Sequence, residues 1–170
     1  MTRIPTNGFI TNPAIGAGES LYLYYLIAPA TTANNVVVSI SGGNQAIRGV
    51  STSYTDAKQS AQPDASANNV ADVANTITTS VTTVADNCWT VSVSTNDSDF
   101  PAASTGLTER TQSSILGIGD SNAAITPAGA YSMTWDTEGA GNVSWCMIAA
   151  SFSPVPPAVT TKTLAALGVG

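Results

Sequence analysis

The sequence has no histidine, few charged residues and only two cysteines. Without histidine, the chain has no Ser-His-Asp or Cys-His catalytic arrangement, no histidine-ligated metal and no imidazole that titrates near neutral pH. Two cysteines do not complete a tetrahedral zinc site on their own. We therefore predict a protein that is not an enzyme and that uses no cofactor and no resident metal.

Positive charge is scarce as well. Only 9% of the 170 residues are charged, the net charge is −6, and the five basic residues are scattered along the chain. Nucleic acid needs clustered Lys and Arg, so it is not an expected partner. The longest apolar run, Leu21 to Ala30, is shorter than the about 18 residues of a transmembrane helix. No apolar signal-peptide segment follows Met1, and membrane insertion is not predicted.

Small hydroxyl residues are abundant, with 23 Thr and 19 Ser, and the apolar pattern is that of strands. Residues 21–28 are apolar on both faces, as in a strand buried on both sides. Residues 55–69 are polar and predict a loop, Gly139 to Asn142 predicts a hairpin loop, and no segment predicts a helix. The expected strands are 21–28, 36–40, 46–54, 76–84, 88–93, 107–111, 114–118, 130–135 and 143–152.

These strands predict an all-β fold, an antiparallel two-sheet sandwich of the jelly-roll or Ig-like kind. Residues 1–153 would form the sandwich. Residues 154–170 begin with a Pro-rich stretch and continue as an apolar tail, which predicts an extended C-terminal arm.

Cys88 and Cys146 each adjoin a tryptophan. Alternation places Cys88 on a face with Thr90 and Ser92, and Cys146 on a face with Ile148 and Phe152. We therefore favour two reduced cysteines acting as small strand residues. A disulfide within the domain is the alternative, and an outward-facing Cys88 would allow a link between subunits.

Three short motifs have weak chemical signals. Asn96-Asp97-Ser98-Asp99 spaces two carboxylates as calcium ligands require but lacks the remaining ligands, so solvated acids are favoured. Gly117-Ile118-Gly119-Asp120 resembles a phosphate loop without the helix that such a loop needs. Asn96 and Asn142 each begin an N-glycosylation sequon, a pattern that is common by chance.

Carbohydrate binding requires an exposed aromatic ring. Trp135 is the candidate for ligand contact, because Thr134 and Asp136 flank it with polar groups. Trp89 and Trp145 lie in predicted strands, which favours a place in the core. Eleven acidic residues include no pair that stands out as the two carboxylates of a glycosidase.

Four segments together resemble a known group of modules. They are Leu23 to Pro29 followed by Asn35 to Val38, then Ser53-Tyr54-Thr55 with Gln59 and Pro63-Asp64-Ala65, then Asp86 to Trp89, and finally Trp145 to Pro154. In order and spacing they resemble Thr/Ala-rich β-sandwich modules of phage virion and tail proteins and of bacterial surface proteins. The resemblance implies a structural or adhesive role and contributes no catalytic residues.

In such modules a segment like Met1 to Ile4 follows several N-terminal strands, which are absent here. The chain is then a fragment, or a neighbouring subunit completes its sheet by strand addition, with the tail after Pro157 as a candidate donated strand. The prediction is a non-enzymatic virion subunit: a capsid decoration protein, head fibre or tail-associated protein. Its partners would be copies of itself and other capsid or tail proteins. The alternatives are a subunit of an extracellular filament or adhesin at the cell surface, and a carbohydrate-binding module that binds cell-surface glycans.

Overall fold

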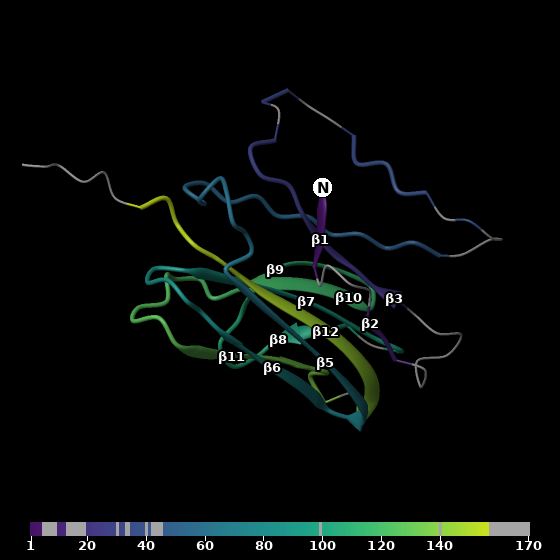
Figure 1. Cartoon of the computed structure of the whole chain (residues 1–170). Helices are drawn as coiled ribbons and strands as arrows, with labels where there is room; N and C mark the ends of the chain where they lie inside the picture. Colours follow the sequence, from purple (N-terminus) through teal and green to yellow (C-terminus); the bar gives the residue numbers. More distant parts are fainter. Residues whose placement is uncertain are drawn as a thin grey trace, which may run out of the picture.

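Strands dominate the computed structural model, which describes residues 1–4, 10–12, 20–29, 31–32, 35–39, 41, 46–98, 100–139 and 141–156. Within these ranges there are twelve strands and no helix. The predicted all-β sandwich is confirmed, with the added detail that the strands form three layers (Figure 1).

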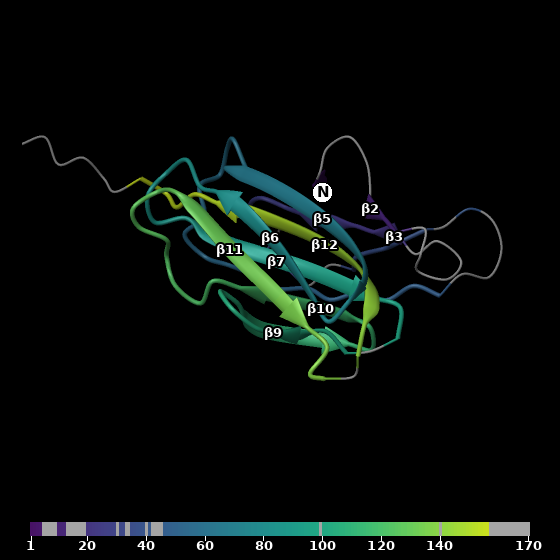
Figure 2. The same cartoon turned by 90° about the horizontal axis from the view of Figure 1, so that it is seen from below.

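The middle layer is a five-stranded antiparallel sheet. Its strands lie in the order β5 (Ala65–Ala74), β12 (Val143–Phe152), β7 (Trp89–Asn96), β10 (Leu116–Asp120) and β9 (Thr108–Ser113). A three-stranded sheet covers one face, as Figure 2 shows from below, in the order β6 (Thr76–Thr82), β11 (Ala130–Asp136) and β8 (Ala102–Ala103). Two short antiparallel pairs lie over the other face: β1 (Thr2–Ile4) with β4 (Leu23–Tyr25), and β2 (Ile10–Thr11) with β3 (Ser20–Leu21).

Strand β12 joins the two cores. Nine of its ten residues are buried, and successive side chains point to opposite faces of the sheet. One core, between the two larger sheets, contains Ile77, Val81, Met133, Trp135, Val143, Trp145, Met147 and Ala149. The other, under the N-terminal strand pairs, contains Ile4, Ile10, Leu21, Val93, Leu116, Cys146, Ile148 and Ala150. A strand that is apolar throughout is the expected form for a layer covered on both sides.

The three-stranded sheet has one solvent-exposed face, called the wet face below. Along β6 the side chains alternate between buried and exposed, with Ile77 and Val81 pointing inward and threonines and a serine outward. Across to β11, the hydroxyls of Thr78 and Thr134 lie 2.9 Å apart, and Ser80 pairs with Ser132 in the same way. The hydroxyl residues of these two strands therefore form a solvent-facing surface on which Asp136, at the end of β11, is the one charged residue.

The strand predicted at 21–28 is wrong in two respects. Only β3 and β4 form there, and Tyr22, Tyr24 and Leu26 are exposed by 42%, 49% and 52%. The segment lies on the outside of the middle sheet, so only alternate residues such as Leu21 reach a core. An outer layer buries one face however apolar its sequence is.

The strands predicted at 36–40 and 46–54 are also wrong. The described residues of these segments are in no strand, although Val36, Val37 and Val38 have a high strand propensity. Ile40 lies outside the described residues. Strand propensity produces a strand only where a neighbouring edge supplies the hydrogen bonds, and no such edge pairs with these residues in the described part of the fold.

The predicted polar loop at 55–69 overlaps a real strand. β5 begins at Ala65 and pairs with β12, while its other edge has no partner strand in the described sheet. As an edge strand with one exposed face, it packs small alanines against the core instead of large apolar residues. Its composition therefore lacks the alternation that marks a half-buried strand.

The predicted hairpin at Gly139 to Asn142 is wrong as well. β11 belongs to the three-stranded sheet and β12 to the five-stranded sheet, so the connection crosses between layers. Ala140 lies outside the described residues. At the other end of β12, Pro154 bridges to Ala57 and the Val155 amide donates to the Asp56 carbonyl at 2.8 Å. The chain is thus still held to the sandwich at 154–155, and the rest of the predicted arm, from Pro157 to Gly170, lies outside the described residues.

Candidate functional site

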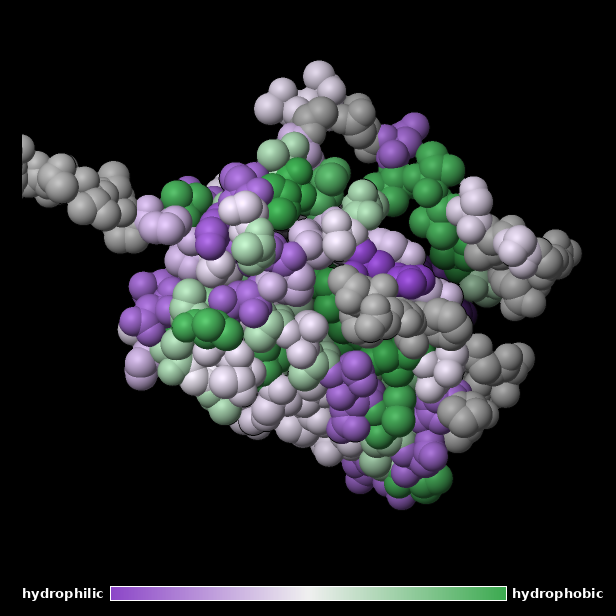
Figure 3. Space-filling model, viewed as in Figure 1, coloured by the Kyte–Doolittle hydropathy of each residue, from purple (hydrophilic) through white to green (hydrophobic). Residues whose placement is uncertain are grey.

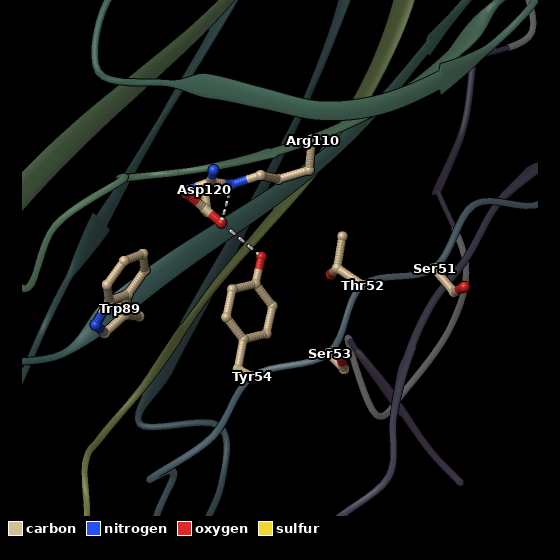
Figure 4. A pocket seen from close by; sticks show the side chains of 7 residues that line it. All are labelled: Ser51, Thr52, Ser53, Tyr54, Trp89, Arg110 and Asp120. Carbon is tan, nitrogen blue, oxygen red and sulfur yellow. Dashed lines mark hydrogen bonds and ion pairs between the residues drawn. The ribbon is translucent and has the colours of Figure 1, made fainter.

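A pocket of about 480 Å³ opens on the face of the middle sheet that carries the N-terminal strand pairs, near the ends of β7, β9 and β10. Its volume is within the about 300–1,000 Å³ of small-molecule sites. The sheet contributes Trp89, Arg110 and Asp120, and the segment that runs back toward the sheet contributes residues 51–54 (Figure 4). The lining combines two aromatic rings, one ion pair and three small hydroxyl groups.

Asp120 is the centre of this pocket and is fully buried. Arg110 binds it with two parallel bonds, Nε to Oδ2 and Nη2 to Oδ1, each 2.7 Å long. The Tyr54 hydroxyl donates to Oδ2 at 2.8 Å, and the backbone amide of Asn122 donates to Oδ1 at 2.8 Å. Burial alone raises the pKa of Asp120, but these donors together outweigh it and hold the pKa below its ordinary value. The carboxylate is therefore ionised.

Tyr54 is held in the neutral form that donates to Asp120. Burial is the largest contribution that raises its pKa, and the hydrogen bond to Asp120 adds to it, so that the pKa reaches about 12. A hydrogen bond with Thr52 acts in the opposite direction but is outweighed. The Asp120 carboxylate raises the pKa of Arg110 in turn. At neutral pH the three groups are one cation, one anion and one neutral phenol.

The two aromatic rings of the pocket meet at an angle. The ring centroids of Tyr54 and Trp89 lie 6.2 Å apart with the planes inclined at 46°. Tyr54 is 40% exposed and Trp89 is partly buried. Figure 4 shows the Tyr54 hydroxyl directed at Asp120 while its ring stands between Trp89 and Thr52. The pocket thus has an aromatic corner on one side and hydroxyl groups on the other.

The prediction that Trp135 contacts a ligand is wrong. Its side chain is fully buried, and its indole Nε1 donates to Ser92 Oγ at 2.9 Å. The polar neighbours Thr134 and Asp136 point to the wet face, so the alternation of β11 directs Trp135 into the core. Of the two tryptophans assigned to the core, Trp145 is fully buried, whereas Trp89 lines the pocket.

The Gly-Ile-Gly-Asp motif makes room for Trp135. A Cβ atom on Gly117 would lie 2.9 Å from the Trp135 ring, and one on Gly119 would lie 3.4 Å from it and 2.8 Å from the Thr108 carbonyl oxygen. Both glycines therefore face the core between the large sheets. Asp120 follows the opposite alternation, with Leu116 and Ile118, and reaches the pocket. In the sequence, the one signal for this site is the position of Asp120, a charged residue that continues the alternation of the apolar residues Leu116 and Ile118.

The cysteine predictions are settled by strand register. Cys146 pairs with Thr95 on β7, seven residues beyond Cys88, which corresponds to a separation of about 23 Å along the strand. A disulfide requires Cα atoms closer than about 7 Å, so the disulfide alternative is wrong. Both cysteines are fully buried, which also excludes the link between subunits through an outward-facing Cys88.

Cys88 is a shielded thiol. Its Sγ donates to Asp64 Oδ2 at 3.4 Å. Burial raises the pKa of Cys88 to about 11, with the Asp64 hydrogen bond and charge as further causes. At neutral pH the thiol is therefore protonated and unreactive.

The candidate calcium motif is partly outside the described residues, since Asp99 is not described. Asp97 Oδ1 accepts from Ser98 Oγ at 3.2 Å and from the Ser144 amide at 3.4 Å. Within the described ranges no three acidic or cysteine side chains gather as metal ligands would. Of the two sequon asparagines, Asn96 is fully buried and Asn142 is exposed.

A second surface of interest is the segment between β4 and Tyr54, residues 26–53, which we call the excursion. Figure 1 shows it leaving the sheets and returning to them, and Figure 3 shows hydrophobic atoms on its outer part. Val36, Val37 and Val38 are exposed by 63%, 82% and 61%, and Leu26 and Ile47 by about half. Two tyrosines hold its ends: Tyr25 donates to the Gln62 carbonyl and Tyr54 to Asp120. No helix in the described residues is long and apolar enough to cross a membrane.

Comparison with protein-family models finds no match, and comparisons with curated proteins and with solved structures find none either. The resemblance to phage and bacterial surface modules stays a prediction.

Proposed function

We propose that this chain is a non-enzymatic structural subunit of a phage virion, a decoration, head-fibre or tail-associated protein. Copies pack against one another, and against other capsid or tail proteins, through the excursion. The resemblance to virion modules favours this class, and the hydroxyl-rich face of β6 and β11, with Asp136 as its one charge, suits a particle surface that stays hydrated.

One observation carries the proposal: apolar side chains are exposed together on a segment that is held at both ends. Five of the fourteen large hydrophobic side chains exposed in the described residues belong to the excursion, and three more, Tyr22, Tyr24 and Tyr54, flank it in the sequence. Soluble monomers seldom gather exposed apolar residues in this way, and such patches mark interaction surfaces. Because Tyr25 and Tyr54 hold the ends, the segment is presented to a partner with part of its ordering entropy already lost.

The distribution of charge supports a second copy of the chain as the partner. The excursion contains a single charged residue, Arg48, and none of the eleven acids of the chain. The rest of the chain carries all of those acids and four basic residues. A weakly positive, apolar segment therefore meets an acidic surface when two copies associate, which favours their encounter.

Light scattering of the purified full chain tests the assembly. We expect a concentration-dependent oligomer, which replacement of Val36, Val37 and Val38 by threonine converts to monomer. Threonine preserves the strand propensity and removes the apolar surface. The matched control replaces Val70 and Val73 by threonine, since these valines are exposed by 46% and 70% on β5, away from the excursion. A wild-type chain that stays monomeric at high concentration contradicts the proposal, as does equal loss of assembly in both variants.

Immunogold labelling tests the location. Antibodies against the purified chain should label phage particles released from the producing culture. Label confined to filaments or to the cell surface would instead establish the filament or adhesin alternative.

A further inference from the structure

We infer that the pocket between residues 51–54 and the sheet binds a neutral hexose, with Trp89 as the stacking ring. This goes beyond the proposed structural role and does not depend on it, because all the lining residues belong to one chain. Residues 51–53 are also the last residues of the excursion, but a monomer holds the complete pocket and can bind sugar by itself.

The pocket carries no net charge. Arg110 and Asp120 neutralise each other through two 2.7 Å bonds, and the other lining residues are uncharged near neutral pH. Asp120 is fully buried, so its carboxylate does not face a ligand. The pocket therefore offers no net charge to attract an ion, and the net charge of −6 on the chain disfavours anions. A neutral, polyhydroxyl ligand fits these electrostatics.

The aromatic corner formed by Trp89 and Tyr54 suits a sugar ring. A pyranose ring has one face of C–H groups and a rim of hydroxyls, so it binds where an aromatic ring lies beside hydrogen-bonding groups. Trp89 and Tyr54 meet at 46° and are both partly accessible. Trp89 is fixed at the start of β7 by its pairing with Phe152 of β12, which gives a rigid platform. An apolar surface with a few placed polar groups is typical of small-molecule sites.

The pocket also offers hydrogen-bonding groups to a ligand. Arg110 has five N–H groups, and its Nε and Nη2 groups bind Asp120 and Asn122. Its Nη1 group makes no hydrogen bond to any described residue, and neither do the hydroxyls of Ser51 and Ser53. Because Asp120 fixes the guanidinium plane, Nη1 is oriented before a ligand arrives. These groups suit the hydroxyl rim of a hexose.

The pocket is built to bind and not to cleave. Glycoside hydrolysis uses two carboxyl groups about 5–10 Å apart. Asp120 is the single carboxylate among the lining residues, and it already accepts four hydrogen bonds. It holds Arg110 and Tyr54 in place and does not act on a substrate.

Saturation-transfer difference NMR on the full chain tests the inference, with methyl α-glucoside, methyl α-mannoside and methyl β-galactoside as neutral probes and sialic acid as the charged comparator. We expect transfer to at least one neutral glycoside, strongest at ring C–H protons, and weaker or no transfer to sialic acid. Trp89→Ala should weaken binding about tenfold or more, the loss of one aromatic contact.

Two further variants make the result decisive if Trp89→Ala fails to fold. Ser53 is exposed at the pocket wall, so Ser53→Glu places a bulky charge there and should abolish binding without changing the thermal midpoint. Tyr22→Ala is the matched control, an exposed aromatic outside the pocket that should leave binding unchanged. The inference is overturned if no neutral glycoside binds, if sialic acid binds best, or if Ser53→Glu binds as well as the wild type.

Discussion

Strand β7 and the excursion contain similar residues and behave in opposite ways. Both have closely spaced valines, Val91 and Val93 in one and Val36 to Val38 in the other. β7 has neighbours on both edges, β12 and β10, and its valines are 3–4% exposed. The valines of the excursion are in no described strand and are exposed by 61–82%. A β-branched sequence forms a strand where neighbouring strands supply hydrogen bonds and a core buries its side chains. Without them its side chains stay exposed and accessible to a partner.

The largest expected difference between the two regions comes from removing a core ring. Trp135→Ala deletes a fully buried side chain and its bond to Ser92, and should lower the free energy of unfolding by about 3–5 kcal/mol. Urea denaturation of monomeric protein measures it. A loss below about 1 kcal/mol would mean that the two large sheets do not close on this ring.

A smaller effect distinguishes two glycines. Gly117→Ala places a Cβ 2.9 Å from the Trp135 ring, and overpacking of this kind should cost about 2 kcal/mol. Gly49→Ala in the excursion is the control, because nothing lies within 4 Å of its added Cβ, and its unfolding midpoint should not fall. Equal midpoints for the two variants would refute the close packing of β10 on Trp135.

The hydrogen bond between Tyr54 and Asp120, which joins the end of the excursion to the middle sheet, should make the stability of the protein depend on pH. Tyr54 has its pKa raised to about 12, so its stabilisation is complete below about pH 10 and is lost as the pH rises toward 12. Asp120 has a lowered pKa, so its stabilisation is present above about pH 4 and is lost as the pH falls further. Tyr54→Phe should cost about 1 kcal/mol at neutral pH. It should also remove part of the alkaline decline in thermal midpoint, and an unchanged alkaline limb would contradict the bond to Asp120.

The smallest effect is expected in the excursion itself. Val37→Thr in monomeric protein should change the free energy of unfolding by less than about 0.5 kcal/mol, because this side chain is 82% exposed. Val93→Thr on β7 is its counterpart and should destabilise by more, since it places a hydroxyl in a core. Equal changes in the free energy of unfolding for Val37→Thr and Val93→Thr would contradict the difference in burial between the excursion and β7.

Alternation predicted the middle of the fold because burial there follows the two-residue period. The strands at 76–84, 130–135 and 143–152 were located closely, and the last agrees at both ends. β5 was missed because its side chains are small and its edge is unpaired. The three-layer order and the exposure of Val36 to Val38 depend on partners distant in sequence, which local patterns do not contain.

The site was missed for a related reason. Trp135 was selected because its neighbours in sequence are polar, but in a strand those neighbours point to the opposite face. Trp89, Arg110 and Asp120 come from three strands, and Tyr54 comes from a segment that is not a strand. Asp120 at the end of the Leu116, Ile118 alternation was the one local signal. Only the pairing of β7, β10 and β9 brings these residues to one place.

The central position of β12 also constrains the order in which the molecule folds during synthesis. β5 and β7 leave the ribosome early, yet each needs β12 as its neighbour, and β12 contributes to both cores. We therefore expect nascent chains that end before Val143 to lack both cores and to depend on chaperones or stay unfolded. The apolar excursion is synthesised before β12, so it is presented on a folded body only once the β12 segment has emerged.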